Sequence, residues 1–450
     1  MGFSSRQFSP AQLLAVSIAG LIAAGTLLLW LPASSARQQL SLVDALFTST
    51  SAVCVTGLIV VDTPADLSVF GQAVVLLLIQ AGGLGYMAIT TVVAVAIGRQ
   101  LSVHERLTLQ EALNVQTMEG LIRFVLSVFK LTVVFELIGG LLLTARWMEE
   151  MGVGRALYYG LFHSVSAFNN AGFALFSDSL IGYRSDWFVN AVIVALVVSG
   201  GVGFIVLTEL GAWRRKSGRR LSLHTKLVLT MTVLLFATAT VLVLVLERNN
   251  PGTLGALGPG EMLLAAAFQA ITPRTAGFNT LDIGALTPAS QFLTMVLMFI
   301  GAAPGGTGGG IKVTTFAITV AALWATVRGM EEPAIFKRRL APALVGRAFF
   351  ISLIAFLALN GVAALLLITE ERQLLPTLFE TTSAFGTVGL SMGEGGAPVS
   401  LAGHFSDVGK LLIAAMMFMG RIGPLTLAVA VARRGSPARL RYPEGKILVG

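Results

Sequence analysis

Long apolar runs alternate with short polar stretches along the 450-residue chain. A helix rises about 1.5 Å per residue, so about 20 apolar residues span the roughly 30 Å of hydrocarbon in a bilayer. The first run is longer than the apolar core of a secretory signal, and we expect it to be retained as a helix. The runs long enough to cross a membrane cover residues 11–31, 70–97, 122–145, 187–210, 225–247, 291–325, 348–369 and 408–432.

A shorter, less apolar segment lies between the two members of each pair of runs. It is too short to cross the membrane and too apolar for an ordinary loop, as is typical of a re-entrant segment. These segments are FTSTSAVCVTGL from Phe47, FHSVSAFNNAGF from Phe162, AFQAITPRTAGF from Ala267 and FETTSAFGTVGL from Phe379. Each ends with a glycine and an apolar residue, the glycines being Gly57, Gly172, Gly277 and Gly389.

The fourfold repetition predicts an all-α integral membrane protein in which four pseudo-symmetric helix–pore loop–helix repeats, with eight spanning helices, surround one central ion pore. The repeats cover residues 11–97, 122–211, 225–327 and 347–432, and a C-terminal segment covers 433–450. Irregular backbone is tolerated inside a membrane only where it is buried in protein or lines a water-filled cavity. The re-entrant segments are therefore expected to line the pore.

Backbone carbonyls of these segments are the predicted ion ligands. Carbonyl dipoles can replace the water shell of a potassium ion, and glycine allows the backbone angles that aim them at the pore axis. The alternative is that the segments are ordinary turns that cap short helices. The predicted selectivity filter consists of Val55, Thr56, Gly57, Asn170, Ala171, Gly172, Thr275, Ala276, Gly277, Thr387, Val388 and Gly389.

A second repeated feature is a glycine cluster in the second helix of each repeat. Either close helix packing or a wide internal passage could require these glycines, because glycine inside a helix costs about 1 kcal/mol relative to alanine. The clusters are Gly82-Gly83-Leu84-Gly85, Gly200-Gly201-Val202-Gly203, Gly305-Gly306-Thr307-Gly308 and Gly420-Arg421-Ile422-Gly423.

Arg421 and the third cluster are the predicted barrier below the filter. Arg421 replaces a glycine in mid-span, where a guanidinium is expensive unless it faces water or a partner; on the pore axis it would repel a cation and could bind loop carbonyls. The alternative is that Arg421 pairs with Glu209 or extends its guanidinium to the membrane interface. Pro304 and the glycines break the helix of run 291–325 and predict a loop inside the pore rather than a linker outside it. The barrier residues are Arg421, Pro304, Gly305, Gly306, Thr307, Gly308, Gly309, Gly310 and Lys312.

The charge distribution predicts the orientation of the chain. Only 12% of residues are charged, and the net charge of +8 lies largely in short clusters between apolar runs, such as those at 214–220 and 337–339. This arrangement indicates a membrane protein and not a nucleic-acid partner. Basic clusters favour the cytoplasmic side, so we expect both termini inside and the re-entrant segments outside.

Other functional classes lack their signatures. The sequence contains no HExxH motif, and its one cysteine and four dispersed histidines disfavour a disulfide or metal site. We therefore predict no enzyme and no cofactor on this chain. A proton-coupled transporter would require a carboxyl within a span, and the notable candidates, Glu136 and Glu209, do not recur in the other repeats.

The motifs CVTGL, NNAGF, RTAGF and GTVGL, the stretch FIGAAPGGTGGGIKVTT and the end RYPEGKILVG resemble the membrane subunits of bacterial Ktr potassium uptake systems, in the wider Trk/Ktr/HKT superfamily. The resemblance implies a pore subunit in the bacterial plasma membrane, a homodimer, and a cytoplasmic ring of regulatory subunits that carry the nucleotide. It also implies that the loop at 302–312 acts as a gate. Gly57 favours potassium, because serine there goes with sodium permeation in the superfamily; a sodium-permeable or Trk-type member is the alternative.

Overall fold

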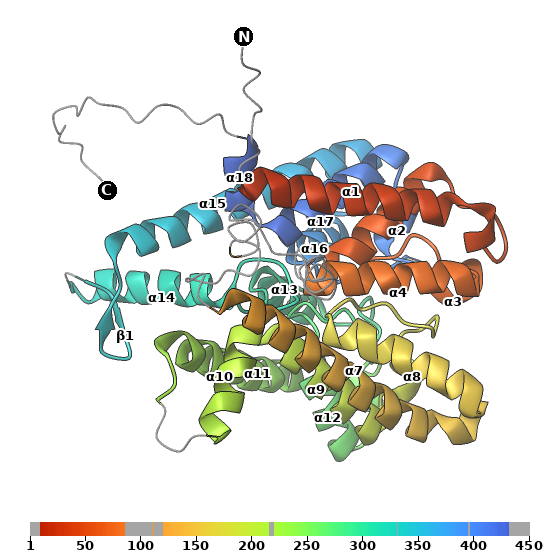
Figure 1. Cartoon of the computed structure of the whole chain (residues 1–450), viewed down its shortest axis with the longest axis horizontal. Coiled ribbons are helices and arrows are strands. Elements are labelled where there is room, and N and C mark those ends of the chain that lie inside the picture. The colour runs from red at the N-terminus through yellow and green to blue at the C-terminus, as the bar shows by residue number, and fades with distance from the viewer. Residues whose placement is uncertain are drawn as a thin grey trace, which may run out of the picture.

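The computed structural model describes residues 10–85, 110, 120–215, 220–330, 332–394 and 397–431. It shows an integral membrane protein that is mostly helical (Figure 1). Within the described ranges, four helices are long and apolar enough to cross a membrane. They are α1 (Pro10–Trp30), α7 (Leu121–Met151), α11 (Leu223–Glu247) and α15 (Pro342–Glu370). The predicted segment 433–450 and residues 86–97 of the first repeat lie outside the described residues.

Each long helix is followed by a short helix, an extended glycine segment and a second, shorter helix. The short helices are α2 (Leu42–Cys54), α8 (Val153–Phe168), α12 (Pro259–Ile271) and α16 (Leu374–Gly386). The second, inner helices are α4 (Val69–Leu84), α9 (Trp187–Gly201), α13 (Pro288–Phe299) and α17 (Asp407–Ile422). Three further helices follow inner helices: α10 (Phe204–Arg215), α14 (Val313–Val327) and α18 (Pro424–Val431).

Small elements complete the connections between these helices. The helical turn α3 (Thr63–Asp66) precedes α4, and a two-stranded antiparallel hairpin joins α14 to α15. The strands of the hairpin are β1 (Ala334–Ile335) and β2 (Arg338–Arg339). The 3-10 turns are η1 (Pro32–Ser34), η2 (Ile181–Tyr183), η3 (Leu254–Ala256) and η4 (Leu401–His404).

The repeats pack in a closed cycle. Each short helix packs on the long helix of its own repeat, and the inner helix of one repeat contacts the short helix of the next: α4 contacts α8, α9 contacts α12, and α13 contacts α16. Finally, α17 contacts α2 and joins the fourth repeat to the first, as the adjacent red and blue helices in Figure 1 show. The extended segments, which follow the short helices, therefore converge at the centre of the cycle.

The inner helices break at their glycine clusters, which corrects the prediction of continuous helices over 187–210 and 408–432. α9 ends at Gly201, and α10 continues at an angle of 102° after Gly203. α17 ends before Gly423, and α4 ends before Gly85. These glycines have φ values of 91°, 90° and 78°, a left-handed conformation that ends a right-handed helix and is readily adopted only by glycine.

The first glycine of a cluster allows the inner helix to approach the end of a short helix. An ideal Cβ on Gly82 would lie 2.0 Å from the carbonyl oxygen of Val53, and one on Gly200 would lie 1.9 Å from that of Phe168. An ideal Cβ on Gly420 would lie 1.9 Å from the carbonyl oxygen of Phe385. No side chain fits in that space, so close backbone packing accounts for these positions.

In the third and fourth repeats, the C-terminal end of the long helix is tied to the start of the inner helix. Glu247, at the end of α11, is fully buried and accepts bonds from the backbone N–H and the hydroxyl of Thr287, the N-cap of α13, at 2.9 and 2.6 Å. Glu247 also accepts bonds from Asn250 and Thr253 at 2.7 and 2.6 Å. Glu370 of α15 binds Ser406, the N-cap of α17, in the same way.

Glu247→Ala should therefore destabilise the third repeat, because four donors lose one buried acceptor. Hydrogen bonds to a charged group contribute about 1.5–3 kcal/mol each but are not additive, so we expect a loss of about 3 kcal/mol in the free energy of unfolding. Heating the purified protein in detergent and measuring the fraction that stays monodisperse tests this. Glu149→Ala, which removes an exposed carboxyl near the end of α7, is the control. Equal melting temperatures for the two variants would contradict the role given to Glu247.

Candidate functional site

The four extended segments meet in a ring of backbone contacts. An ideal Cβ on Gly57 would lie 2.3 Å from the carbonyl oxygen of Ala171, and one on Gly172 would lie 3.0 Å from that of Ala276. An ideal Cβ on Gly277 would lie 2.4 Å from the carbonyl oxygen of Val388. The cycle closes in the first repeat, because one on Gly389 would lie 2.3 Å from the carbonyl oxygen of Thr56. The structure thus brings together the residues that the sequence singled out in all four repeats.

The same unusual backbone conformation recurs in each segment. The glycine and the residue two positions before it both have positive φ, whereas the residue between them does not. Left-handed angles at alternate positions turn successive carbonyls toward the same side of the chain. A non-glycine residue in this region costs about 1–3 kcal/mol, and Val55, Thr275 and Thr387 are β-branched as well. Such strain, repeated in every copy, is typical of a functional site.

Hydroxyl groups at the ends of the short helices hold the segments in place. Ser51 Oγ accepts a bond from the N–H of Gly57 at 3.0 Å, and Ser383 Oγ accepts one from Gly389 at 3.1 Å. In the second repeat Ser166 Oγ donates to the carbonyl of Phe173 at 2.7 Å, and in the third Thr272 donates to that of Phe278. These residues were not predicted individually, although a hydroxyl six residues before the glycine in three repeats was a signal in the sequence.

Side chains of the left-handed residues touch the loop that interrupts the third inner helix. Asn170 lies 3.1 Å from the hydroxyl of Thr275 and 3.2 Å from that of Thr307. Thr387 Oγ1 accepts a bond from the N–H of Gly309 at 2.9 Å. An ideal Cβ on Gly308 would lie 2.0 Å from Thr275 Oγ1, so glycine is required there. The loop therefore lies directly against three of the four segments.

The loop itself is an ordered element that connects α13 to α14. Its two ends pair, because the N–H of Gly301 donates to Ile311 at 2.8 Å. It also binds the broken inner helices of other repeats: Ala303 donates to Gly201 at 3.0 Å, and Gly310 donates to Gly420 at 3.3 Å. The predicted loop over 302–312 is thus anchored to repeats two and four.

Arg421 bridges this loop to the first inner helix. Its guanidinium donates to the carbonyl of Thr307 in the loop and to that of Gly82 in α4, with Gly83 at 3.4 Å. Glu209 does not pair with it, but accepts bonds from Ser222 and Thr225. Arg421 thus joins the fourth, third and first repeats.

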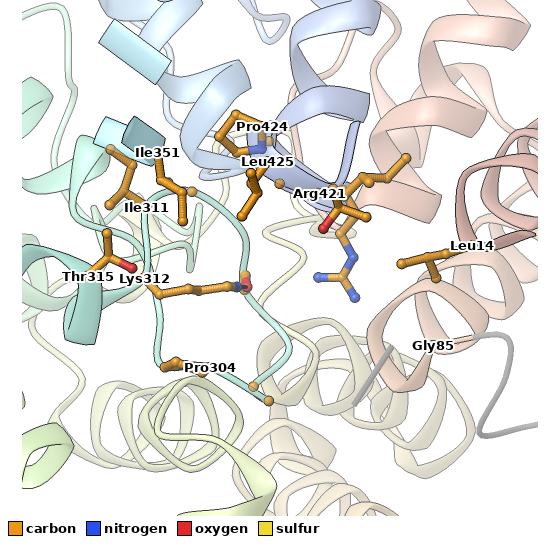
Figure 2. Close-up of a pocket in the computed structure, with 18 of the residues that line it drawn as sticks. Leu14, Gly85, Pro304, Ile311, Lys312, Thr315, Ile351, Arg421, Pro424 and Leu425 are labelled. Carbon is orange, nitrogen blue, oxygen red and sulfur yellow. Dashed lines mark hydrogen bonds between the residues drawn. The ribbon is translucent and has the colours of Figure 1, made fainter. Parts of the chain in front are cut away.

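A cavity of about 430 Å³ lies beside the loop. The side chains of Arg421 and Lys312 extend into it from different elements, and Leu14, Ile351 and Leu425 form part of its apolar wall (Figure 2). Lys312 Nζ donates to the carbonyl of Gly308 at 2.6 Å, so this lysine also holds the loop. The cavity wall of the described chain therefore carries positive charge next to the loop and the filter segments.

Asn169, three residues before Gly172, binds side chains of two neighbouring helices. Its amide nitrogen donates to Glu136 Oε1 and to Gln80 Oε1, both at 2.9 Å, and Gln80 donates to Glu136 Oε2 at 3.2 Å. Glu136 is therefore a buried acceptor that joins α4, α7 and α8. Cys54, at the same position of the first repeat, is buried in an apolar cluster, as expected for a packing residue.

Carbonyl oxygens, and not side chains, are the ligands that this site offers. Among the described residues, no group of three or more His, Cys, Asp or Glu side chains could hold a metal ion. A ring of carbonyls can replace the hydration shell of a monovalent cation without acid–base chemistry. The arrangement therefore suits binding and passage of an ion.

Comparisons with known proteins agree with this geometry. The TrkH family model, described as a cation transport protein, matches residues 9–439. The chain is 43% identical over 445 residues to the Ktr system potassium uptake protein B of Bacillus subtilis, covering 99% of this chain and 97% of that protein. It is 40% identical to the protein of the same name from Vibrio alginolyticus, covering 98% and 94%. It is 36% identical to the potassium/sodium uptake protein NtpJ of Enterococcus hirae, covering 99% and 98%.

A solved structure has the same fold. The crystal structure of the potassium transporter TrkH from Vibrio parahaemolyticus matches with a TM-score of 0.73, covering 96% of this chain and 87% of that one, at 19% identity. The similarity to Ktr membrane subunits noted in the sequence is confirmed by the full-length relatives. The chain therefore belongs to the TrkH family of cation transport proteins, which are transporters and not enzymes.

Proposed function

We propose that this chain is the potassium-conducting pore subunit of a Ktr-type uptake system. The observation that carries the proposal is the closed ring of four extended segments, each with the same alternating left-handed conformation. The relatives named as Ktr system potassium uptake proteins support potassium as the ion. Potassium is the transported ion here, and the chain itself carries no other cofactor in this proposal.

Permeation follows from exchanging water for carbonyl oxygens. A hydrated potassium ion reaches the ring from the outer side, loses water, and is held by carbonyls of the residues at and before Gly57, Gly172, Gly277 and Gly389. The serine hydroxyls behind the ring keep these carbonyls from turning away. Because the oxygens are preorganised, the ion does not have to order them on arrival. Conduction also requires that the ion is not bound too strongly to leave.

Below the ring, the loop at 302–312 and Arg421 form the gate in this proposal. The loop lies against the filter residues, and the positive charge of Arg421 opposes a cation that has passed them. The hydrogen bonds to Thr307 and Gly82 hold the loop in place. Opening requires these bonds to break, so that Pro304, Lys312 and the glycines between them can move aside.

The membrane arrangement extends the same proposal. The four repeats contribute eight spans around one pore, in a bacterial plasma membrane, with both termini in the cytoplasm as the basic clusters indicate. Two copies form a homodimer, and a cytoplasmic ring of nucleotide-binding subunits pulls on the inner helices to open the gate. Residues 433–450, which we propose to contact the ring and the second copy, lie outside the described residues.

A second candidate function is passage of sodium as well as potassium. The relative named as a potassium/sodium uptake protein supports it. Gly57 argues for potassium, because a serine at this position goes with sodium permeation in the superfamily. Sodium and potassium fluxes measured side by side distinguish the two functions.

Gly57→Ser should reduce the preference for potassium. The new Cβ would lie 2.3 Å from the Ala171 carbonyl, so the ring must distort, and the residue has a φ of 90° that serine adopts with strain. The potassium-to-sodium flux ratio in reconstituted vesicles measures the effect. Gly152→Ser is the control, because Gly152 also has positive φ but has open space around its Cβ position. An unchanged potassium-to-sodium flux ratio in Gly57→Ser would show that Gly57 is not part of a selectivity filter.

Ser51→Ala should also lower that ratio, because the buried N–H of Gly57 loses its acceptor. An unsatisfied buried donor costs about 1–3 kcal/mol, which corresponds to roughly a tenfold change in an equilibrium that depends on the aligned state. Thr50→Val is the matched control, since Thr50 donates only to Leu46 of its own helix. If both variants select potassium equally well, the hydroxyl of Ser51 does not position the filter.

Arg421→Ala, and separately deletion of residues 305–310, should raise potassium flux in vesicles that lack the regulatory subunits. Arg421→Lys distinguishes charge from bonding, because lysine keeps the charge but loses the planar fork that binds two carbonyls at once. A closed Arg421→Lys variant assigns the barrier to charge, whereas an open one assigns it to the hydrogen bonds. Arg328→Ala, at the exposed end of α14, is the control. Folded Arg421→Ala and deletion variants that conduct no faster than the parent would rule out this gate.

A further inference from the structure

One position of the repeat has a different environment in each copy. It lies three residues before the filter glycine and is occupied by Cys54, Asn169, Arg274 and Gly386. In the second repeat, Asn169 faces the gap between the preceding inner helix α4 and its own long helix α7, and Gln80 and Glu136 from those helices satisfy its amide. The equivalent gap in the third repeat lies between α9 and α11.

In that gap Arg274 lines a pocket of about 260 Å³. Most of its lining residues come from α9 and α11, and the loop residue Ala302 also lines it. Val198, two residues before the glycine cluster, occupies the place that Gln80 has in the first inner helix, and no carboxyl corresponds to Glu136 among the residues that line the pocket. The other lining residues are Val194, Val197, Gly201, Val202, Thr232, Val233, Phe236 and Ile271.

The polar groups of this pocket lack partners. No hydrogen bond or ion pair joins the side chain of Arg274 to another described residue, and both its buried Nε and the buried hydroxyl oxygen of Thr232 are unsatisfied. A guanidinium within a membrane costs at least about 2.5 kcal/mol on insertion scales, and an unpaired one costs more because nothing offsets its desolvation. Arg274 and Thr232 thus border an otherwise apolar pocket with a cation and a hydroxyl that no described protein group satisfies.

The depth and the opening of the pocket restrict what can enter. Val233, on its rim, is 65% exposed on the face of a helix that spans the membrane, so the pocket opens toward lipid chains. Thr232 and Phe236 lie at least nine residues from either end of α11, which places them roughly 14 Å or more from each end of the helix. The headgroup of a two-chain phospholipid stays at the interface, whereas a single-chain acid can bring its acidic group to this depth.

We propose that this pocket binds a long-chain carboxylic acid from the membrane. The carboxylate pairs with Arg274, the hydroxyl of Thr232 donates to the same carboxylate, and the acyl chain lies along the valines of α9 and past Val233 into lipid. The ligand thus supplies a carboxyl group that the described part of the chain lacks in this gap. In the second repeat, Glu136 supplies the corresponding carboxyl to Asn169. A charge-assisted pair in a dry site is the strongest polar interaction available to such a ligand.

The site adjoins the proposed gate. The occupant contacts Ala302 and Gly201, and the neighbouring Ala303 N–H donates to the Gly201 carbonyl at 3.0 Å. A bound acid therefore stabilises the loop in the position seen here and lowers potassium flux. This consequence rests on the proposed function, but the binding itself does not, so binding and flux are measured separately.

The binding experiment uses oleate labelled with ¹³C at its carboxyl carbon and the full chain in nanodiscs of phosphatidylcholine. We expect one saturable site per chain, with a carboxyl resonance shifted from that of oleate in protein-free discs. Arg274→Gln should weaken the affinity roughly tenfold or more, because it removes the charge. Val198→Phe, which fills the pocket and leaves Arg274 in place, should abolish saturable binding. Arg248→Gln, at the exposed end of α11, should bind as the parent does.

Four results would overturn the proposal. Methyl oleate, which has the same chain without a charge, would bind as tightly as oleate if only the apolar wall mattered. Chloride or inorganic phosphate alone would displace the label completely if the site took a small aqueous anion, and phosphatidylglycerol would do so if it took a phospholipid headgroup. Unchanged binding in folded Arg274→Gln and Val198→Phe would place the fatty acid elsewhere. If oleate binds as expected but no potassium flux is detected, the transport proposal is wrong. The binding site is then still supported.

Discussion

The close approach of four glycine-containing backbone segments is the constraint on which the rest of the structure depends. Each segment brings a glycine against a carbonyl of the next, at distances that exclude any side chain. To hold backbone this close, the short helices must end at one point, and the inner helices must press on those ends through Gly82, Gly200 and Gly420. The hydroxyls behind the ring and the carboxyls of Glu247 and Glu370 then bind polar groups at the ends of the helices.

The same constraint explains why the inner helices break and why the loop lies where it does. After pressing on the short helices, three inner helices end at a glycine with positive φ. The third instead forms the loop, which lies under Asn170, Thr275 and Thr387 and is bonded to Gly201 and Gly420. Side chains of the extended segments thus contact the loop, so a movement of the loop changes the surroundings of these segments. Arg421 holds the loop in place because its planar guanidinium donates to carbonyls of two other repeats at once, those of Thr307 and Gly82.

Much of this architecture could be predicted because the chain repeats itself. Gly57 and its three equivalents were visible as a pattern, and Pro304 with its glycines marked the broken third helix. The breaks after α9 and α17 were missed because the glycines of a short cluster can be accommodated within a helix, and the positive φ of Gly203 and Gly423 is visible only in the structure. The partners of Asn169 could not be predicted either, since Gln80 and Glu136 lie far from it in sequence. Thr307 as a partner of Arg421 likewise depends on tertiary structure.

The central claim is that four sets of backbone carbonyls make a site that prefers potassium to sodium. The most direct test is calorimetric titration of each ion into the purified parent chain, in a buffer whose only other cation is a bulky organic one. We expect saturable binding of potassium. Sodium should release little heat and should compete only weakly with potassium for the site. Equal binding of the two ions, or no binding of potassium by a folded and monodisperse protein, would contradict the account.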